Sequence, residues 1–205
     1  KLTVYGASDA LNSLGVEWDE ILKHIKPDEV AVYGGSALSQ IDEHSLAGLV
    51  GQPLMGNRVN SKMMALSLAE MPADFINSYV INSVGTTGNN IGACATFLYN
   101  LRQGMIDIQT GKAKVVIVGN AEAPVVPDVI EGFRVMGALA TDEDLCALDQ
   151  SDSVDNRRAC RPFSSNAGFT LAEAAQFVVL MDDELALTLG VTIYGSVADV
   201  FVNAD

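Results

Sequence analysis

The chain has 205 residues, within the range of one domain, and 49% of them are hydrophobic, enough to build a buried core. Its formal net charge of −14 argues against nucleic acid as a partner, because phosphates are bound by clustered Lys and Arg. No charge-poor apolar stretch is long enough to cross a bilayer, so a membrane protein is not expected. Three cysteines without paired spacing argue against a disulfide framework and indicate a reducing compartment, so we expect a cytoplasmic protein.

The two histidines lie in polar surroundings in the N-terminal part of the chain. Residues 18–26 predict a charged amphipathic helix that is stopped by Pro27, with His24 on its solvated face. His44 follows two acidic residues in a polar turn. Neither histidine has metal-ligand spacing to other candidate ligands, so we expect no metal site and no catalytic role for either.

The central part of the chain predicts a strand, a turn, a helix and a second strand. Residues 80–84 are a short apolar run, and residues 85–93 are a turn rich in Gly and Asn. A helix is expected next, ending before Gly111, because apolar residues recur at helical spacing at Cys94, Leu98, Leu101, Met105 and Ile108. Residues 115–118 are β-branched and predict a strand covered on both faces, which completes a βαβ unit.

Cys94 lies where the turn meets the predicted helix. A helix N-terminus carries partial positive charge and unpaired N–H groups, which favour a thiolate and can hold an oxyanion during acyl transfer. A small cysteine at the start of a buried helix can equally serve only to fill space. The position of Cys94 therefore leaves a nucleophile and a packing residue as open interpretations.

The C-terminal half contains two further cysteines and a long polar stretch. Cys146 lies among acidic residues, which disfavour a thiolate, whereas Cys160 is flanked by three arginines, which favour one without supplying a base. We interpret Cys146 as structural and Cys160 as a decoy for thiol labelling. Residues 141–156 predict an inserted surface loop, and residues 191–198 predict a strand.

Five stretches in collinear order resemble the β-ketoacyl synthases, a family of the thiolase fold. The nucleophile motif of that family, Ala-Cys followed by Ala or Ser, is similar to Gly92-Ala93-Cys94-Ala95-Thr96. The other stretches are residues 29–36, similar to an early strand and glycine turn; residues 115–122, similar to a strand ending in Gly-Gly-Ala-Glu; residues 132–139; and residues 161–176. Collinear motifs are far more specific than one short match, so the resemblance favours the nucleophile interpretation.

The resemblance implies roles for individual residues. Cys94 is expected to be the catalytic nucleophile, and its backbone N–H one oxyanion donor. Phe133 is expected to line the acyl pocket from a loop, and Glu173 to be a buried structural acid. The chain departs from the family at Asn120, which replaces a glycine, and around Glu173, where three glycines are lost. These departures suggest a divergent branch of the family.

The implied fold is α/β, with the α/β/α layers of the thiolase fold and mostly the first of its two similar halves. On this interpretation residues 1–205 are one ketosynthase N-terminal-half domain that is incomplete at both ends, and Leu2 to Tyr5 are what remains near an opening strand. The catalytic histidines of the family would lie in the second half. In the family, the strand before the nucleophile pairs across a homodimer axis, which implies residues 78–82 as that edge.

The implied activity is that of a β-ketoacyl-acyl carrier protein synthase of fatty acid or polyketide biosynthesis. Cys94 would accept an acyl group from a thioester, and a malonyl thioester would then lose carbon dioxide and attack the acyl-enzyme. Acyl carrier protein or acyl-CoA thioesters are the implied partners, and no metal or organic cofactor is required. The alternatives are a thiolase acting on acyl-CoA and a noncatalytic half-domain for dimerisation or acyl binding.

Docking of an acidic carrier protein requires a local basic patch on this acidic chain. Arg58 and Lys62 are the only cations between Lys26 and Arg102, and they are predicted to share a helix with Met63. They are therefore weak candidates for carrier contact. The simpler alternative is that they belong to an ordinary solvated helix face.

Overall fold

The structure is a computed structural model that describes residues 1–203, and it divides into two compact units. Unit 1 joins Lys1–Glu122 to the segment that begins at Ala174, and unit 2 is Ala123–Glu173. Unit 2 is thus one continuous excursion between two segments of unit 1. The prediction of a single domain over residues 1–205 is not tested by this division.

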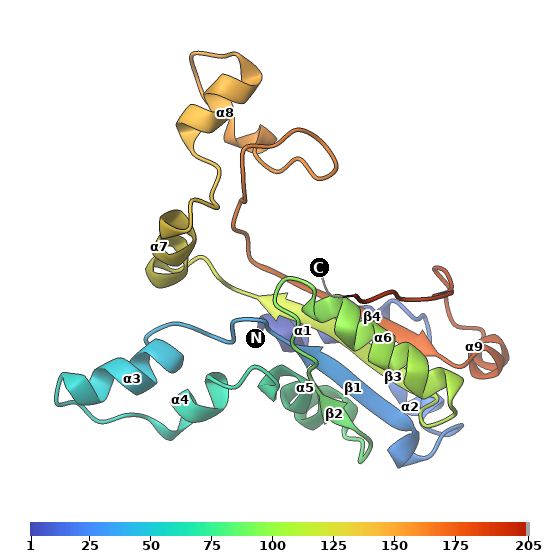
Figure 1. The fold of residues 1–205 in the computed structure, drawn as a ribbon. Coiled ribbons are helices and arrows are strands. Elements are labelled where there is room, and N and C mark those ends of the chain that lie inside the picture. The colour runs from blue at the N-terminus through green and yellow to red at the C-terminus, as the bar shows by residue number, and fades with distance from the viewer. Residues whose placement is uncertain (204–205) are drawn as a thin grey trace. The chain divides into compact units, whose positions relative to one another are not determined.

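Unit 1 is built on a four-stranded sheet (Figure 1). Its strands are β1 (Val30–Gly35), β2 (Thr87–Gly88), β3 (Val115–Glu122) and β4 (Ala174–Met181), in the order β2-β1-β3-β4. β1 is parallel to β2 and β3, whereas β4 is antiparallel to β3. The strands predicted at residues 29–36 and 115–118 are therefore confirmed, at the centre of the sheet.

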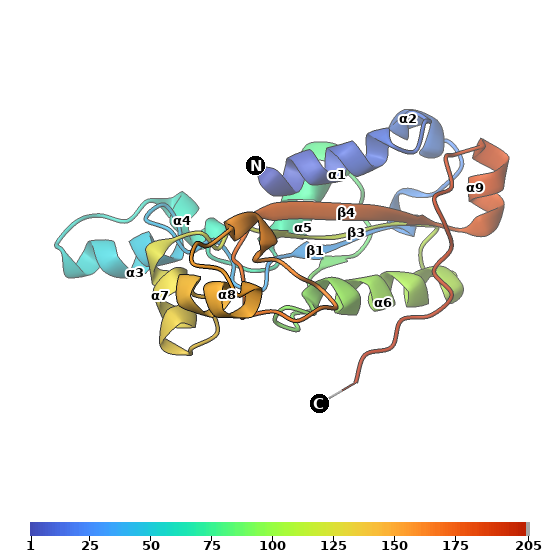
Figure 2. The ribbon, with the colours of Figure 1, turned by 90° about the horizontal axis from the view of Figure 1, so that it is seen from above.

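Helices cover both faces of this sheet, which confirms the α/β/α layers (Figure 2). One layer holds α1 (Leu2–Asn12), α2 (Trp18–Ile21), α5 (Met71–Ile76) and α9 (Asp183–Leu189), and the other holds α6 (Thr96–Gln109). β3 contributes side chains to the hydrophobic core on each face of the sheet, because side chains alternate between the two faces along a strand. Val115 and Ile117 pack toward α1 and α5, whereas Val116 and Val118 pack toward α6.

The face that α6 turns to the sheet differs from the predicted apolar face. Leu101 and Ile108 pack against the core, but Leu98 is 45% exposed. The fully covered positions are small or polar: Thr96, Asn100, Gly104 and Asp107. Gly104 explains this closeness, since a Cβ there would lie 2.8 Å from Val118 Cγ2 and 3.1 Å from Val116 Cγ1. The helix axis therefore approaches β3 along the side that carries no bulky side chain.

The remaining elements are short helices. In unit 1, α3 (Leu46–Leu54) and α4 (Ser61–Leu66) follow β1, a 3₁₀ turn spans Pro27–Glu29 and a π-helical turn spans Asn77–Ile81. Unit 2 contains α7 (Pro127–Val135), α8 (Asp142–Asp149) and a 3₁₀ turn at Asn156–Arg158. The surface loop predicted at residues 141–156 is wrong in part, because α8 lies within it. Thr141 caps that helix by accepting a hydrogen bond from Asp144 N, and the acidic first turn suits its positive end.

Two predicted strands near the N-terminus and before the nucleophile turn are helical instead. Residues 80–84 fall in and after the π-helical turn, where Ile81 is buried against α1 and α5. An apolar run this short does not distinguish a strand from a buried helical turn. The dimer edge expected at residues 78–82 is therefore wrong, and β2 is the strand at that edge of the sheet. Leu2 to Tyr5 form the first turn of α1, because its Ala7 and Leu11 anchor a helix on the core.

Two further predictions fail over other segments. Within residues 18–26 only α2 is helical, and the chain then turns toward β1. Residues 191–198 form neither helix nor strand. This segment makes only isolated hydrogen bonds to other segments, such as the one that Thr192 N donates to Leu14 O at 2.8 Å. It pairs with no strand of the described residues, so no ladder forms.

Candidate active site

Cys94 is exposed on a tight turn between β2 and α6. The helix begins at Thr96, so Cys94 precedes it by two residues rather than opening it. The preceding residue, Ala93, has φ +47°, a left-handed conformation that is unfavourable for a residue with a Cβ. This conformation turns the backbone sharply and presents the thiol on the surface, which contradicts a role in packing the described core.

Thr96 holds the near side of this turn. Its buried hydroxyl accepts a hydrogen bond from Gly92 N at 3.1 Å and donates one to Ala93 O at 2.7 Å. Within residues 1–203, the Cys94 N–H donates no hydrogen bond. An exposed thiol beside an unpaired N–H at a helix N-terminus is an arrangement suited to acyl transfer onto sulfur.

A second polar residue of α6, Asn100, reaches the start of the turn. Its Oδ1 accepts from Asn90 N at 2.7 Å, and its Nδ2 donates to Asn89 Oδ1 at 2.8 Å. Asn89 in turn donates from Nδ2 to the carbonyl oxygens of Ser36, at 3.3 Å, and Ala69, at 3.0 Å. The turn is thereby connected to the end of β1.

Glu122 ties the ends of β1 and β3 together next to this connection. Its carboxylate accepts from Ser36 Oγ at 2.7 Å, Ala37 N at 2.5 Å and Asn120 Nδ2 at 2.9 Å. Asn120, which stands where the family has glycine, keeps its Oδ1 buried with no hydrogen-bond partner among the described residues. The substitution therefore adds one bond to Glu122 and leaves one acceptor unsatisfied.

Sequence reasoning singled out Cys94 as a candidate but did not single out Thr96, Asn89 and Asn100, whose side chains bond the turn. Hydrophobic periodicity does not mark buried polar residues, since it treats them as solvent-facing. The available signal was chemical. Two adjacent asparagines in the turn and a third that lies six residues after Cys94 supply side chains of the kind that bond the backbone of tight turns.

Phe133 lies in unit 2, on α7 rather than in the loop that we predicted. It packs edge-to-face against Phe169, with ring centroids 6.0 Å apart and an interplanar angle of 74°. A pair of hydrogen bonds fixes Phe169: Ala140 N donates to Phe169 O at 2.9 Å, and Phe169 N donates to Ala138 O at 2.7 Å. Unit 2 thus contains a defined aromatic pair that includes the predicted substrate-binding residue.

Glu173 does not match the predicted buried acid. It is exposed at the residue before β4, and no ion pair or side-chain hydrogen bond holds it among the described residues. β4, which follows Glu173, is an edge strand and pairs only with β3 among the described strands.

The candidate carrier contacts, Arg58 and Lys62, are both exposed. Only Lys62 lies on α4, whereas Arg58 precedes the helix, so the predicted shared helix is wrong. The cap residue Asn60 accounts for this, because its side chain accepts from Lys62 N at 2.9 Å and starts the helix after Arg58. His24 and His44 are on the surface beside Glu20 and Glu43, as expected.

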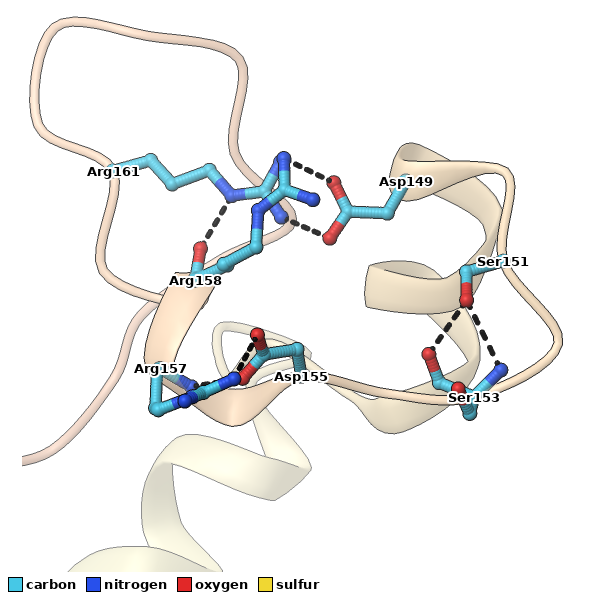
Figure 3. Close-up of polar contacts among 7 residues, drawn as sticks. All are labelled: Asp149, Ser151, Ser153, Asp155, Arg157, Arg158 and Arg161. Carbon is cyan, nitrogen blue, oxygen red and sulfur yellow. Dashed lines mark hydrogen bonds and ion pairs between the residues drawn. The ribbon is translucent and has the colours of Figure 1, made fainter.

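The arginines around Cys160 are paired with carboxylates (Figure 3). Arg158 and Arg161 converge on Asp149, at 3.3 Å and 2.6 Å, and Arg157 pairs with Asp155 at 2.8 Å. Their charge is therefore compensated locally, which removes the argument for an activated Cys160. Arg157 pairing also holds the pKa of the Asp155 carboxyl below its ordinary value.

No group of three or more His, Cys, Asp or Glu side chains in the described part of the chain is arranged to hold a metal ion. Among the helices of residues 1–203, none has the length and apolar character needed to cross a membrane.

Comparison with known proteins places this geometry in context. The chain is 55% identical over all 205 residues to the β-ketoacyl-[acyl-carrier-protein] synthase FabY of Pseudomonas aeruginosa and spans 32% of its length. The crystal structure of that noncanonical ketosynthase superposes with a TM-score of 0.94, over 99% of this chain and 32% of the other. A 3-oxoacyl-[acyl-carrier-protein] synthase 2 of Staphylococcus aureus is 26% identical over 87% of this chain and 41% of its own.

A more distant solved structure shares the fold. It is a type II polyketide synthase acyl-carrier protein in complex with its ketosynthase, AntDE–AntF, with a TM-score of 0.71 and 23% identity over 94% of this chain and 45% of that chain. The family model for the N-terminal domain of β-ketoacyl synthases matches residues 1–186. The chain spans less than half the length of each of these relatives. It has the thiolase-like fold of the N-terminal half of a ketosynthase, and it belongs to the β-ketoacyl synthase family.

Proposed function

We propose that this chain carries the acyl-accepting cysteine of a β-ketoacyl-[acyl-carrier-protein] synthase of fatty acid or polyketide biosynthesis, and that Cys94 is that cysteine. The observation that carries the proposal is the exposed thiol on a sharply bent turn directly before α6. Family membership and 55% identity to FabY supply the reaction class and favour the synthase over the thiolase alternative.

In the proposed reaction, Cys94 Sγ attacks the carbonyl carbon of an acyl thioester. A bond forms between Sγ and that carbon, the carbon–sulfur bond to the carrier breaks, and the carrier leaves as a thiol with the proton of Cys94. The backbone N–H of Cys94 is free to stabilise the oxyanion of the intermediate, and the N-terminal end of α6 favours negative charge there.

In the second step, a malonyl thioester loses carbon dioxide, and the resulting carbanion attacks the acyl-enzyme. The new carbon–carbon bond replaces the bond to sulfur, so a β-ketoacyl thioester forms and the Cys94 thiolate is regenerated. Phe133 is proposed to line the acyl pocket, supported by its fixed edge-to-face pair with Phe169. The reaction as written uses no metal or organic cofactor.

The proposal includes a carrier partner and an assembly state. Acyl carrier protein is the proposed donor, because the relative at 55% identity is a β-ketoacyl-[acyl-carrier-protein] synthase, and Arg58 and Lys62 are the proposed contacts. A homodimer is proposed through the sheet edge that β2 occupies. A cytoplasmic location is proposed because three free cysteines suit a reducing compartment.

The test is acylation of the full-length protein that contains this chain. After incubation with an acyl thioester, peptide mass spectrometry should find the acyl group on Cys94 in the parent and on no cysteine in a Cys94→Ala variant. Cys160→Ala is the matched control, since it removes another exposed thiol and should leave acylation unchanged. Acylation elsewhere, or condensation without release of carbon dioxide from a malonyl donor, would contradict the proposal.

A further inference from the structure

We infer that Asn100 is a positioning residue for Cys94, which fixes the thiol-bearing turn to the end of β1 through Asn89. This inference rests on the proposed function of Cys94. It concerns a buried residue of α6 whose side chain hydrogen-bonds Asn89 and Asn90 rather than Cys94.

Asn100 is a buried polar residue whose side-chain hydrogen bonds both go to the turn. Asn100 is 0% exposed, and an amide that is buried without partners costs about 1–3 kcal/mol. Both of its polar groups are satisfied, and both by the two residues that open the turn, Asn89 and Asn90. A helix that packs on a sheet has no need of a polar residue at such a position. Its two hydrogen bonds therefore assign Asn100 the role of holding the turn.

The turn carries backbone strain at Ala93, and hydrogen bonds restrain it on both sides. A left-handed backbone at a residue such as Ala93 costs on the order of 1–3 kcal/mol, and it persists only where the surroundings enforce it. Thr96 restrains the residues next to Cys94. Asn100 restrains the turn four residues earlier, at Asn90, so the bend cannot relax by unwinding in that direction.

The end of β1 leaves room for the Asn89 side chain. Asn89 reaches the carbonyl oxygens of Ser36 and Ala69, just beyond the end of the strand. A Cβ at Gly35 would overlap the Asn89 amide, so only glycine leaves room for it. The connection from α6 through Asn89 to the end of β1 therefore has a hydrogen bond at each of its steps.

The test compares three single alanine variants and one double variant, Asn89→Ala with Asn100→Ala, in the full-length protein. Asn100→Ala removes the central residue, and Asn89→Ala breaks the same connection from a half-buried position. Asp107→Ala is the matched control, because Asp107 is also a buried polar residue of α6 but bonds Tyr33 and Gln103, away from the turn. The measurements are the maximal single-turnover rate of Cys94 acylation, the half-saturating thioester concentration, and the rate of Cys94 alkylation relative to Cys160.

We expect Asn100→Ala and Asn89→Ala each to lower the maximal acylation rate roughly tenfold or more, with a half-saturating concentration within about twofold of the parent. The double variant should be no slower than the slower single variant, because both residues act through one connection. Cys94 alkylation should slow by about threefold or more in both. Asp107→Ala should lose stability but keep both rates within about twofold.

Parent-like rates in Asn100→Ala and Asn89→Ala, or an equal loss in Asp107→Ala, would overturn the inference. If Asn100→Ala does not fold, Asn89→Ala decides the question by itself. A parent protein that is not acylated at Cys94, together with slowed alkylation in the two variants, would refute the proposed function while sustaining the positioning role.

Discussion

Tyr33 and Asp107 meet inside unit 1, where a phenol from β1 donates a 2.5 Å hydrogen bond to a carboxylate from α6. The two residues are 5% and 2% exposed, and Lys112 Nζ lies 3.3 Å from the same carboxylate. Burial, and then the bond to Asp107 and its charge, raise the pKa of the Tyr33 hydroxyl. The folded state therefore strongly prefers the neutral phenol.

This preference gives a stability prediction with a definite sign. A raised pKa means that the contribution of Tyr33 is fully present below about pH 10, the ordinary tyrosine value, and is lost as the pH rises above it. Tyr33→Phe should lower the free energy of unfolding by about 1 kcal/mol at pH 7, because it loses the bond to Asp107. The difference from the parent should shrink above pH 10. Urea unfolding of the full-length protein from pH 7 to 11 measures both, and parallel curves would refute the assignment.

At the scale of elements, α6 lies close to β3 because Gly104 lets it. Replacing glycine by alanine inside a helix usually stabilises it, since alanine has the higher helix propensity. At Gly104 the added methyl would meet Val118, Val116 and Leu180 at 2.8 to 3.1 Å. Packing and propensity therefore oppose each other at this position, and we expect the overpacking of a filled core to dominate.

Gly104→Ala should therefore lower the free energy of unfolding by about 1–2 kcal/mol. Gly51→Ala in α3 is the matched control, since a Cβ there would meet no atom within 4 Å. It should be neutral or stabilising by up to about 1 kcal/mol. Thermal or urea unfolding of both variants decides between them, and equal signs would show that packing does not govern Gly104.

The elements that could be predicted are those whose hydrophobic pattern has one explanation. β1 and β3 are continuous apolar runs at the centre of the sheet, and α6 has a helical period. Residues 80–84 misled because burial of Ile81 satisfies the same pattern from a π-helical turn. At the site, motif spacing predicts Cys94 as a candidate, whereas the role of Asn100 depends on a tertiary contact with Asn89 that hydrophobic periodicity does not encode. Glu173 was expected to be buried on resemblance alone, and its surroundings in the fold differ.

At the scale of the whole chain, the proposed docking of an acidic carrier protein has to overcome the chain's net charge of −14. Repulsion disfavours most orientations of such a partner, so exposed cations such as Arg58 and Lys62 gain influence. Arg58 and Lys62 occur in no ion pair among the described residues, and the same holds for Lys1, Lys26 and Arg102, whereas Lys23, Lys112 and Lys114 each contact a carboxylate. The charges of Arg58 and Lys62 are therefore available to an acidic partner.

Charge reversal at either position should weaken carrier docking without affecting the chemistry. Arg58→Glu and Lys62→Glu should each raise the half-saturating concentration of an acyl-carrier-protein substrate about threefold or more at low salt, and less at high salt. With the same acyl group on CoA, the half-saturating concentration of each variant should equal that of the parent. Lys23→Glu is the control, because Lys23 is already paired with Glu20. An equal effect on both substrates would exclude a carrier-specific contact.

The strand pair β3–β4 brings the two ends of unit 2 together. Glu122 and Ala174 are partners in the antiparallel register, so the chain leaves for unit 2 and returns at the same rung of the ladder. The entropy of closing such a loop grows only logarithmically, with a doubling in length costing about 0.6 kcal/mol. Unit 2 can therefore lengthen, shorten or be exchanged during evolution at little cost to the sheet, so that the part of the chain bearing Phe133 can diversify while the support of Cys94 is inherited unchanged.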